Sequence, residues 1–427
     1  MRKYYQAVLA IVAVGSLISL LVYRHEYNRL RYVLEVFNYF GKPGQRSDVN
    51  CTFNSFKLSK LKHNFDFPTP AWQRVDSDLY IYSAYNIHKN KVHAIAIAAQ
   101  HINLDIACSI FLENNITEIP GTFQYKRMQH TEEAYNLDYS GYYFICLYDE
   151  KKLATRIKFT ISSKPASDSP IFPIKSQIHS HNLNSSVVCV APPLKKPISN
   201  SDLFTFLNFH EMIGLGNFIV YDFGISSHLI LKLKEMSNSQ VPYWKLAYTT
   251  VPWNFPYTDA NQNMIKDIIE ADCLYRTYNK VTYSMVLSWE EYIVLKYHHL
   301  FDDLMRDFNK TFLTADKYKL KMFTFCTEQK DHSTNFTLSI FRKTFYNPTV
   351  IQSRSTYIYK PYETLNKANL VTRDAGKDLI SINRYQSCKT NVFKHETGIY
   401  DDKILRFAPE LQDTHNFRKF IDNSLFS

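Results

Sequence analysis

Glycine is scarce in this chain, and the residue patterns of several protein classes are missing. Only 10 of its 427 residues are glycine whereas 15% are aromatic, which favours strand-rich, tightly packed structure over flexible linkers. No Cys-x-x-Cys pair is present, so zinc and redox motifs find no support. Basic residues are scattered rather than interleaved with aromatics, so the net charge of +10 does not indicate nucleic-acid binding. A phosphorylated ligand also suits such a charge.

Cysteines occur only after an apolar N-terminal segment. In an oxidising compartment they allow up to three disulfides and one free thiol, and the sequence leaves their pairing open. The seven positions are Cys51, Cys108, Cys146, Cys189, Cys273, Cys326 and Cys388.

The N-terminal segment Tyr4–Tyr23 carries no charge. At ~1.5 Å per residue its helix would match the ~30 Å hydrocarbon core of a bilayer, which predicts a membrane span. A cleaved signal peptide is the alternative, but the run ends in large residues rather than a small-x-small site. Flanking charges leave the orientation open. Glycosylation acceptors favour a lumenal C-terminal part, at Asn50, Asn115, Asn184, Asn309 and Asn335.

Two patterns follow the span. Residues 24–65 are polar and charged, as expected of a stem. Between Leu79 and Ser163, short β-branched and aromatic runs separated by polar turns predict an antiparallel β-domain, and the polar stretch Ser163–Ser186 is interpreted as a linker.

From Val187 onward strands and helices alternate, which predicts a mostly parallel sheet covered by helices. Ligands of such sheets bind outside the carboxyl ends of strands, where Asp222 and the segment 288–291 fall. The expected strands are 187–191, 218–221, 244–248 and 283–287; the expected helices start at Ser201 or Asp202, at Ser226 or Ser227, and at Gln262.

The order of these elements resembles glycosyltransferase family 92 over residues 75–410. The matching segments are VVCVAPPL, LFTFLNFHEMIGLGNFIVYDFG, NQNMIKDIIEADCLYR and VTYSMVLSWEEYIVL. Members of the family show a CVxP strand, an EFxxHYxxLGVxHFxxYD helix and strand, a Q…NDCLYR helix, and a strand that ends in DxDEF.

The resemblance implies an α/β protein with a GT-A type nucleotide-sugar-binding domain. It further implies inverting transfer of a hexose, galactose in particular, from a UDP-sugar to a glycan acceptor, with Mn²⁺ or another divalent cation bridging the diphosphate. It places the chain in the Golgi as a single-pass type II membrane protein with a lumenal catalytic part. The corresponding segments are a tail (1–3), an anchor (4–23), a stem (24–65), a β-rich domain (66–165) and a transferase domain (187–420).

The metal motif departs from that of the family. Alignment of DxDEF on SWEEY places Ser288 on the first aspartate and Glu290 on the second, with Glu291 following. Ser288 and Glu290 are therefore the candidate metal ligands, although a hydroxyl is a poor ligand for a hard cation. Glu291 is the candidate general base, with Asp302 and Asp303 as alternatives.

Four further residues are candidates for binding the donor. Asp222 can accept hydrogen bonds from the nucleotide or shape a turn. Gln262 begins a helix whose electropositive end suits phosphate, or it is an ordinary cap residue. Asp272 faces a cleft or pairs internally with Arg276. Arg384 occupies the place of the histidine in the HYR motif of the family and can act as a fixed cation.

Three functions remain open from the sequence. The first is hexosyl transfer. The second is a catalytically inactive relative that binds a carbohydrate or a partner, as the altered residues 288 and 384 would allow. The third is a β-rich binding domain unrelated to sugars.

Overall fold

A computed structural model of the chain describes much of residues 72–412. The described part excludes 77, 89, 100–104, 113–116, 129–138, 150–152, 162–168, 177–184, 194–197, 223–246, 258–260, 312–313, 329–335, 337, 349–353 and 389–397. The expected tail, anchor and stem, and the expected helix from Ser226 or Ser227, lie outside the described residues.

Membrane localisation receives no support from the structure. Within the described part of the chain, none of the helices has both the length and the apolar character that a bilayer crossing requires. The prediction of a single-pass type II Golgi membrane protein is therefore not supported by the described residues.

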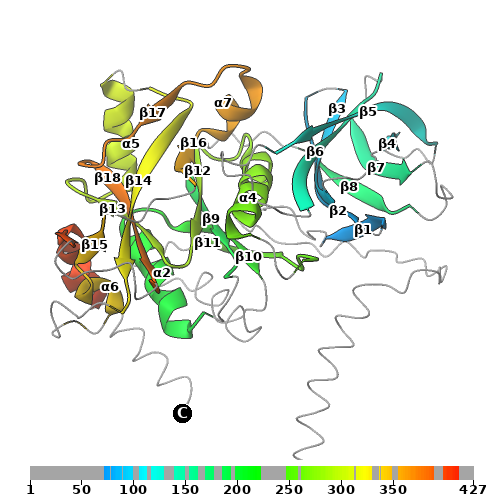
Figure 1. Ribbon diagram of the computed structural model, residues 1–427. Coiled ribbons are helices and arrows are strands. Elements are labelled where there is room, and N and C mark those ends of the chain that lie inside the picture. The colour runs from blue at the N-terminus through cyan, green and yellow to red at the C-terminus, as the bar shows by residue number, and fades with distance from the viewer. Residues whose placement is uncertain are drawn as a thin grey trace, which may run out of the picture. The chain divides into compact units, whose positions relative to one another are not determined.

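The N-terminal part of the described chain, up to Ser176, is a closed barrel of seven strands (Figure 1). Strands follow one another around it in the order β2-β3-β6-β5-β4-β7-β8, and β8 pairs back with β2, on which β1 also pairs. The bounds are β1 Gln73–Asp76, β2 Leu79–His88, β3 Lys91–Ala99, β4 Ile106–Leu112, β5 Ile119–Arg127, β6 Tyr139–Leu147, β7 Ala154–Ile161 and β8 Ile171–Ser176.

Alternation along the strands separates the inside of this barrel from its outer surface. In β3 the alanines at 94, 96 and 98 join the barrel core, whereas Ile95 and Ile97 pack against α4 and the second sheet. Strand β8 lies in the stretch that we interpreted as a linker. The linker interpretation is wrong for residues 171–176. The sequence gives little sign of this strand because it is short and contains Pro173.

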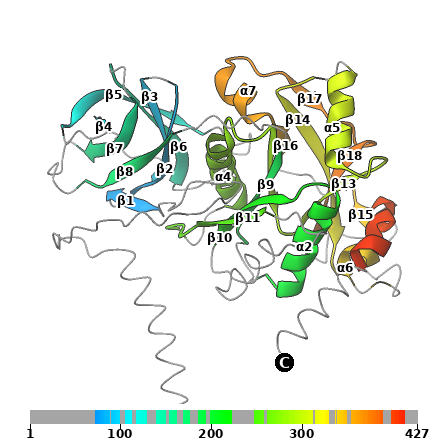
Figure 2. The ribbon, with the colours of Figure 1, turned by 180° about the vertical axis from the view of Figure 1, so that it is seen from behind.

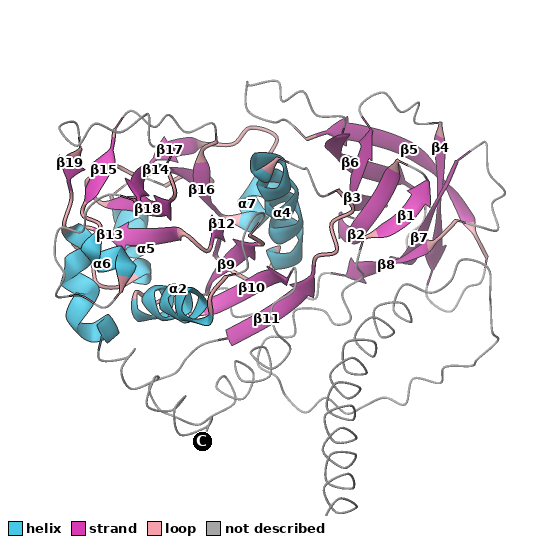
Figure 3. Ribbon diagram, turned by 60° about the horizontal axis from the view of Figure 1, so that its bottom comes forward, coloured by secondary structure: helices cyan, strands magenta, loops and turns pink. Residues whose placement is uncertain are grey.

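A second sheet of eleven strands follows (Figures 2 and 3). Strands β11, β10, β9 and β12 pair in parallel, whereas β16 joins β12 and β14 in antiparallel fashion. The bounds are β9 Ser186–Ala191, β10 Asn217–Asp222, β11 Ala247–Pro252, β12 Tyr283–Ser288, β13 Glu291–Leu295, β14 Lys317–Cys326, β15 Phe345–Asn347, β16 Thr356–Tyr359, β17 Thr372–Asp374, β18 Ile380–Gln386 and β19 Ile399–Tyr400.

Helices cover both faces of the parallel strands. Along β9, Val188 and Val190 face the core that contains α2, while Val187 and Cys189 face the core that contains α4. Burial on both faces explains why this strand is a continuous apolar run. The helical bounds are α2 Asn200–Met212, α4 Gln262–Thr277, α5 Phe301–Lys310, α6 Ser339–Arg342, α7 Pro361–Asn366 and a 3-10 turn, Lys403–Phe407.

Helix starts agree closely with the sequence signals. Helix α4 begins at Gln262 as predicted, because the Asn261 side chain accepts a hydrogen bond from the backbone of Asn263. In α2 the cap is Ser199, which accepts from the backbone of Asp202, rather than Ser201 or Asp202.

The predicted α/β class with its GT-A type domain is wrong. The N-terminal transmembrane helix predicted with it falls on residues 4–23, which lie outside the described residues. Strands make up 49% and helices 24% of the described structure, which is therefore mostly β. Strands and helices alternate from Val187 to Ser288, but the prediction assumed that this alternation continues through the rest of the chain. Beyond that point most of the pairings among strands β13 to β19 are antiparallel.

Six cysteines form three disulfides, the maximum that the sequence allowed. Cys51 lies outside the described residues. The pairs are Cys108–Cys146 in the barrel, Cys189–Cys273 between β9 and α4, and Cys326–Cys388 near the end of β14. Disulfides of this number are typical of a chain that folds in an oxidising compartment.

Candidate functional site

Arg384 brings together most of the residues that the sequence singled out. It lies on β18 directly opposite Glu291 of β13, and the backbone of the next residue, Tyr385, donates to the carbonyl of Glu290. Its Nη2 lies 3.2 Å from Glu290 Oε1 and 3.2 Å from Gln262 Oε1. Its Nε lies 3.8 Å from Glu291 Oε1, which is within ion-pair range but too long for a hydrogen bond.

Glu291 is fully buried and fully engaged. Lys266, one turn along α4 from Gln262, donates to Glu291 Oε1 at 2.6 Å, and the backbone of Ser288 donates to Oε2 at 2.8 Å. Burial by itself raises the pKa of Glu291, but Lys266 and Arg384 overcome it and hold that pKa below its ordinary value. Glu291 is therefore a buried, charged anchor for the turn that joins β12 to β13.

Lys266 is the member of this Arg384 cluster that the sequence did not reveal. Its side chain is only 4% exposed although it lies next to the apolar stripe of α4. A buried lysine needs a buried anion, and only the fold places Glu291 within its reach. We refer to Gln262, Lys266, Glu290, Glu291 and Arg384 together as the Arg384 cluster.

Solvent reaches one side of the Arg384 cluster. The side chains of Glu290 and Arg384 are 29% and 22% exposed, in contrast to the buried pair of Lys266 and Glu291. Two carboxylates and two cations balance in charge. Because an exposed ion pair is weak, on the order of 0–1 kcal/mol, the contact between Arg384 and Glu290 is the one that a ligand can displace.

Ser288 adds no charge to this site. The residue is 2% exposed, and its Oγ is a buried hydroxyl without a hydrogen-bond partner. Its backbone nitrogen, rather than its side chain, takes part by donating to Glu291.

The donor set does not fit Mn²⁺. Hard cations take carboxylate oxygens, but Lys266 holds one oxygen of Glu291, and Arg384 occupies an oxygen of Glu290. Ser288 offers only a neutral hydroxyl. Across the described ranges, no group of three or more His, Cys, Asp or Glu side chains has an arrangement suited to a metal ion.

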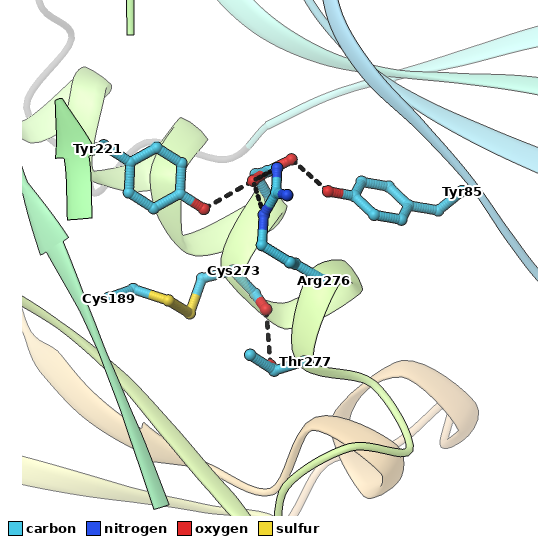
Figure 4. Close-up of a disulfide and its surroundings, with 7 residues drawn as sticks. Tyr85, Cys189, Tyr221, Cys273, Arg276 and Thr277 are labelled. Atoms are coloured by element: carbon cyan, nitrogen blue, oxygen red, sulfur yellow. Dashed lines mark hydrogen bonds and ion pairs between the residues drawn. A yellow bond between two sulfur atoms is a disulfide. The ribbon is translucent and has the colours of Figure 1, made fainter. Parts of the chain in front are cut away.

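Asp272 belongs to a separate, buried polar cluster, and its partners Tyr85, Tyr221 and Arg276 are labelled in Figure 4. Its carboxylate accepts from Ser83 at 2.5 Å and Tyr85 at 2.6 Å on strand β2, and from Tyr221 of β10 at 2.6 Å. Arg276, one turn further along α4, donates to it from Nε and Nη2 at 2.9 and 2.7 Å. Burial opposes ionisation, but the Arg276 guanidinium outweighs it and the pKa of Asp272 falls to about 2. This carboxylate ties the barrel to the second sheet.

The other candidates do not join the Arg384 cluster. Asp222 ends β10, where its carbonyl accepts from the backbone of Trp253. Asp302 and Asp303, the alternative bases, lie in the first turn of α5. His298, which precedes α5, lies 2.9 Å from Asp307.

Comparison with known proteins yields little. No protein-family model matches the sequence, and no curated protein matches it. A solved structure of a cyclomaltodextrinase is similar at a TM-score of 0.16 with 8% identity, over 35% of this chain and 33% of that chain. Such a likeness carries no argument about fold or function. The description of the chain as a Golgi membrane glycoprotein and glycosyltransferase is corrected: the fold is mostly β, and neither the described structure nor these comparisons support that description.

Proposed function

We propose that this chain binds a UDP-sugar at the Arg384 cluster and holds it without transferring the hexose. The nature of the ligand rests on the sequence resemblance, and the absence of transfer rests on Glu291. A general base needs access to its proton and a pKa near the working pH. Glu291 is buried, hydrogen-bonded through both oxygens and ionised well below neutral pH.

Two features support an anionic ligand here. Arg384 presents a planar fork of donors, which matches phosphate oxygens, and its side chain is partly exposed. It lies beside Gln262, the first residue of α4, whose first turn carries no acidic residue and so retains the positive end of the helix dipole. A diphosphate that displaces Glu290 from Arg384 would contact the guanidinium and lie near the positive end of α4. The buried pair of Lys266 and Glu291 would stay intact.

Hexosyl transfer with inversion, from a UDP-sugar to a glycan acceptor, is the second candidate function. The partly exposed carboxylate of Glu290 favours it, because it lies next to the proposed diphosphate position and reaches solvent. In that case Glu290, not Glu291, serves as the base once the ligand has released it from Arg384.

Calorimetry with the full chain tests both functions. We expect UDP and UDP-galactose to bind, Arg384→Ala to weaken that binding by about tenfold or more, and Arg306→Ala to leave it unchanged, since Arg306 is an exposed arginine on α5. Incubation of UDP-galactose with mixed glycan acceptors should release no UDP. Release that disappears in Glu290→Gln would establish the second candidate instead. If neither ligand binds, the proposal fails.

A further inference from the structure

We propose that the Arg384 guanidinium takes the place of a divalent cation while the buried Lys266 neutralises Glu291, so that this site binds a diphosphate without metal. The inference rests on the proposed function. It starts from the disagreement between the donor set and Mn²⁺ described above.

The position of Arg384 supports the replacement. Its guanidinium lies among three oxygen-bearing side chains, Gln262, Glu290 and Glu291, at 3.2, 3.2 and 3.8 Å. Carboxylate and amide oxygens around one point are what a hard cation requires. Here the point is taken by a side chain that the antiparallel pairing of β13 and β18 holds opposite Glu291.

The charges of the site also support the replacement of a divalent cation by fixed side-chain cations. Arg384 is permanently protonated, and Lys266 is paired with Glu291, so two fixed positive charges oppose the two carboxylates. A divalent cation would supply the same total charge. Adding one beside Arg384 would place like charges in contact, and Ser288 contributes no compensating carboxylate. The fixed cations therefore make a mobile one unnecessary and repel it.

Titration of the unmodified full chain with UDP tests this inference without any variant. We expect the dissociation constants in excess EDTA and in Mn²⁺ to agree within about twofold. The electron paramagnetic resonance signal of free Mn²⁺ should not fall when the chain is added. Binding that is more than about tenfold weaker in EDTA, or loss of the free Mn²⁺ signal at one ion per chain, would overturn metal independence and leave the proposed function standing. Failure of UDP to bind in both buffers would overturn the proposed function itself.

Variants then locate the effect. Arg384→Ala should weaken UDP binding by about tenfold or more, because a charge-assisted contact contributes about 1.5–3 kcal/mol. Arg384→Lys should retain part of the affinity, since the charge remains but the fork is lost. The combined change Ser288→Asp with Arg384→His removes the guanidinium and adds ligands, and should make UDP binding depend on Mn²⁺. Unchanged affinity of Arg384→Ala in EDTA would contradict the assigned role of the guanidinium.

Discussion

Replacement of Asp272 by alanine should destabilise the whole described fold rather than impair a ligand site. The carboxylate is 0% exposed and accepts five hydrogen bonds, from Ser83, Tyr85, Tyr221 and twice from Arg276. Its removal leaves the Arg276 guanidinium, 1% exposed, without a counter-charge. Breaking a buried ion pair in this way costs about 3–5 kcal/mol.

A second route gives a similar magnitude. The pKa of Asp272 falls from 3.8 to about 2, so the fold favours the ionised over the protonated carboxyl by ~2 kcal/mol. This free energy is smaller than the cost of truncation to alanine, because a protonated Asp272 keeps its contacts with the hydroxyls of Ser83, Tyr85 and Tyr221, whereas alanine loses them. Since the folded state binds the proton less readily, the contribution is complete above pH 3.8 and is lost as the pH falls toward about 2.

Urea unfolding of the full chain, followed by tryptophan fluorescence at pH 7, measures the effect. Asp272→Ala should lower the free energy of unfolding by about 3–5 kcal/mol. The control Glu363→Ala removes the acid of an exposed i,i+4 pair with Lys367 and should cost less than about 1 kcal/mol. The double change of Asp272 and Arg276 to alanine should cost less than the sum of the single changes by at least ~1 kcal/mol. If Asp272→Ala costs no more than the control, Asp272 does not tie the barrel to the second sheet.

Further tests concern His210, Gly121 and Lys266. Burial lowers the pKa of His210 to about 4, although the hydrogen bond to the Phe206 carbonyl opposes this shift. The free energy of unfolding should therefore fall by ~3 kcal/mol as the pH drops from 6.5 to about 4. The urea midpoint of His210→Leu should lack this decline. Gly121→Ala should cost about 1–3 kcal/mol in urea unfolding, because its Cβ would clash with Cys146 Sγ, and should cost less without that disulfide. Lys266→Met should cost about 3–5 kcal/mol, because Glu291 loses its nearest cation and is left with Arg384 Nε at 3.8 Å. Adding Glu291→Gln should recover part of that loss, and thermal unfolding that shows no recovery would contradict the pairing.

Local signals in the sequence identified much of the second sheet. The apolar run at 187–191 became β9, and the stripe after Gln262 became α4, because both signals depend on neighbours within one element. The cysteine count allowed three disulfides, which the structure contains. The fold class was predicted wrongly, since barrel closure depends on the pairing of β8 with β2, which no local pattern reports.

The site shows the same division. Element order and motif alignment singled out Gln262, Glu290, Glu291 and Arg384, but did not show which of them are in contact. Gln262 and Arg384 are 122 residues apart in sequence, and only the register of β13 on β18 brings Arg384 opposite Glu291. A slip of one residue would turn that side chain to the other face of the sheet. The sequence by itself determined which charged groups were present; tertiary structure decided which cation neutralises each carboxylate, because ion pairing depends on distances that only long-range packing sets.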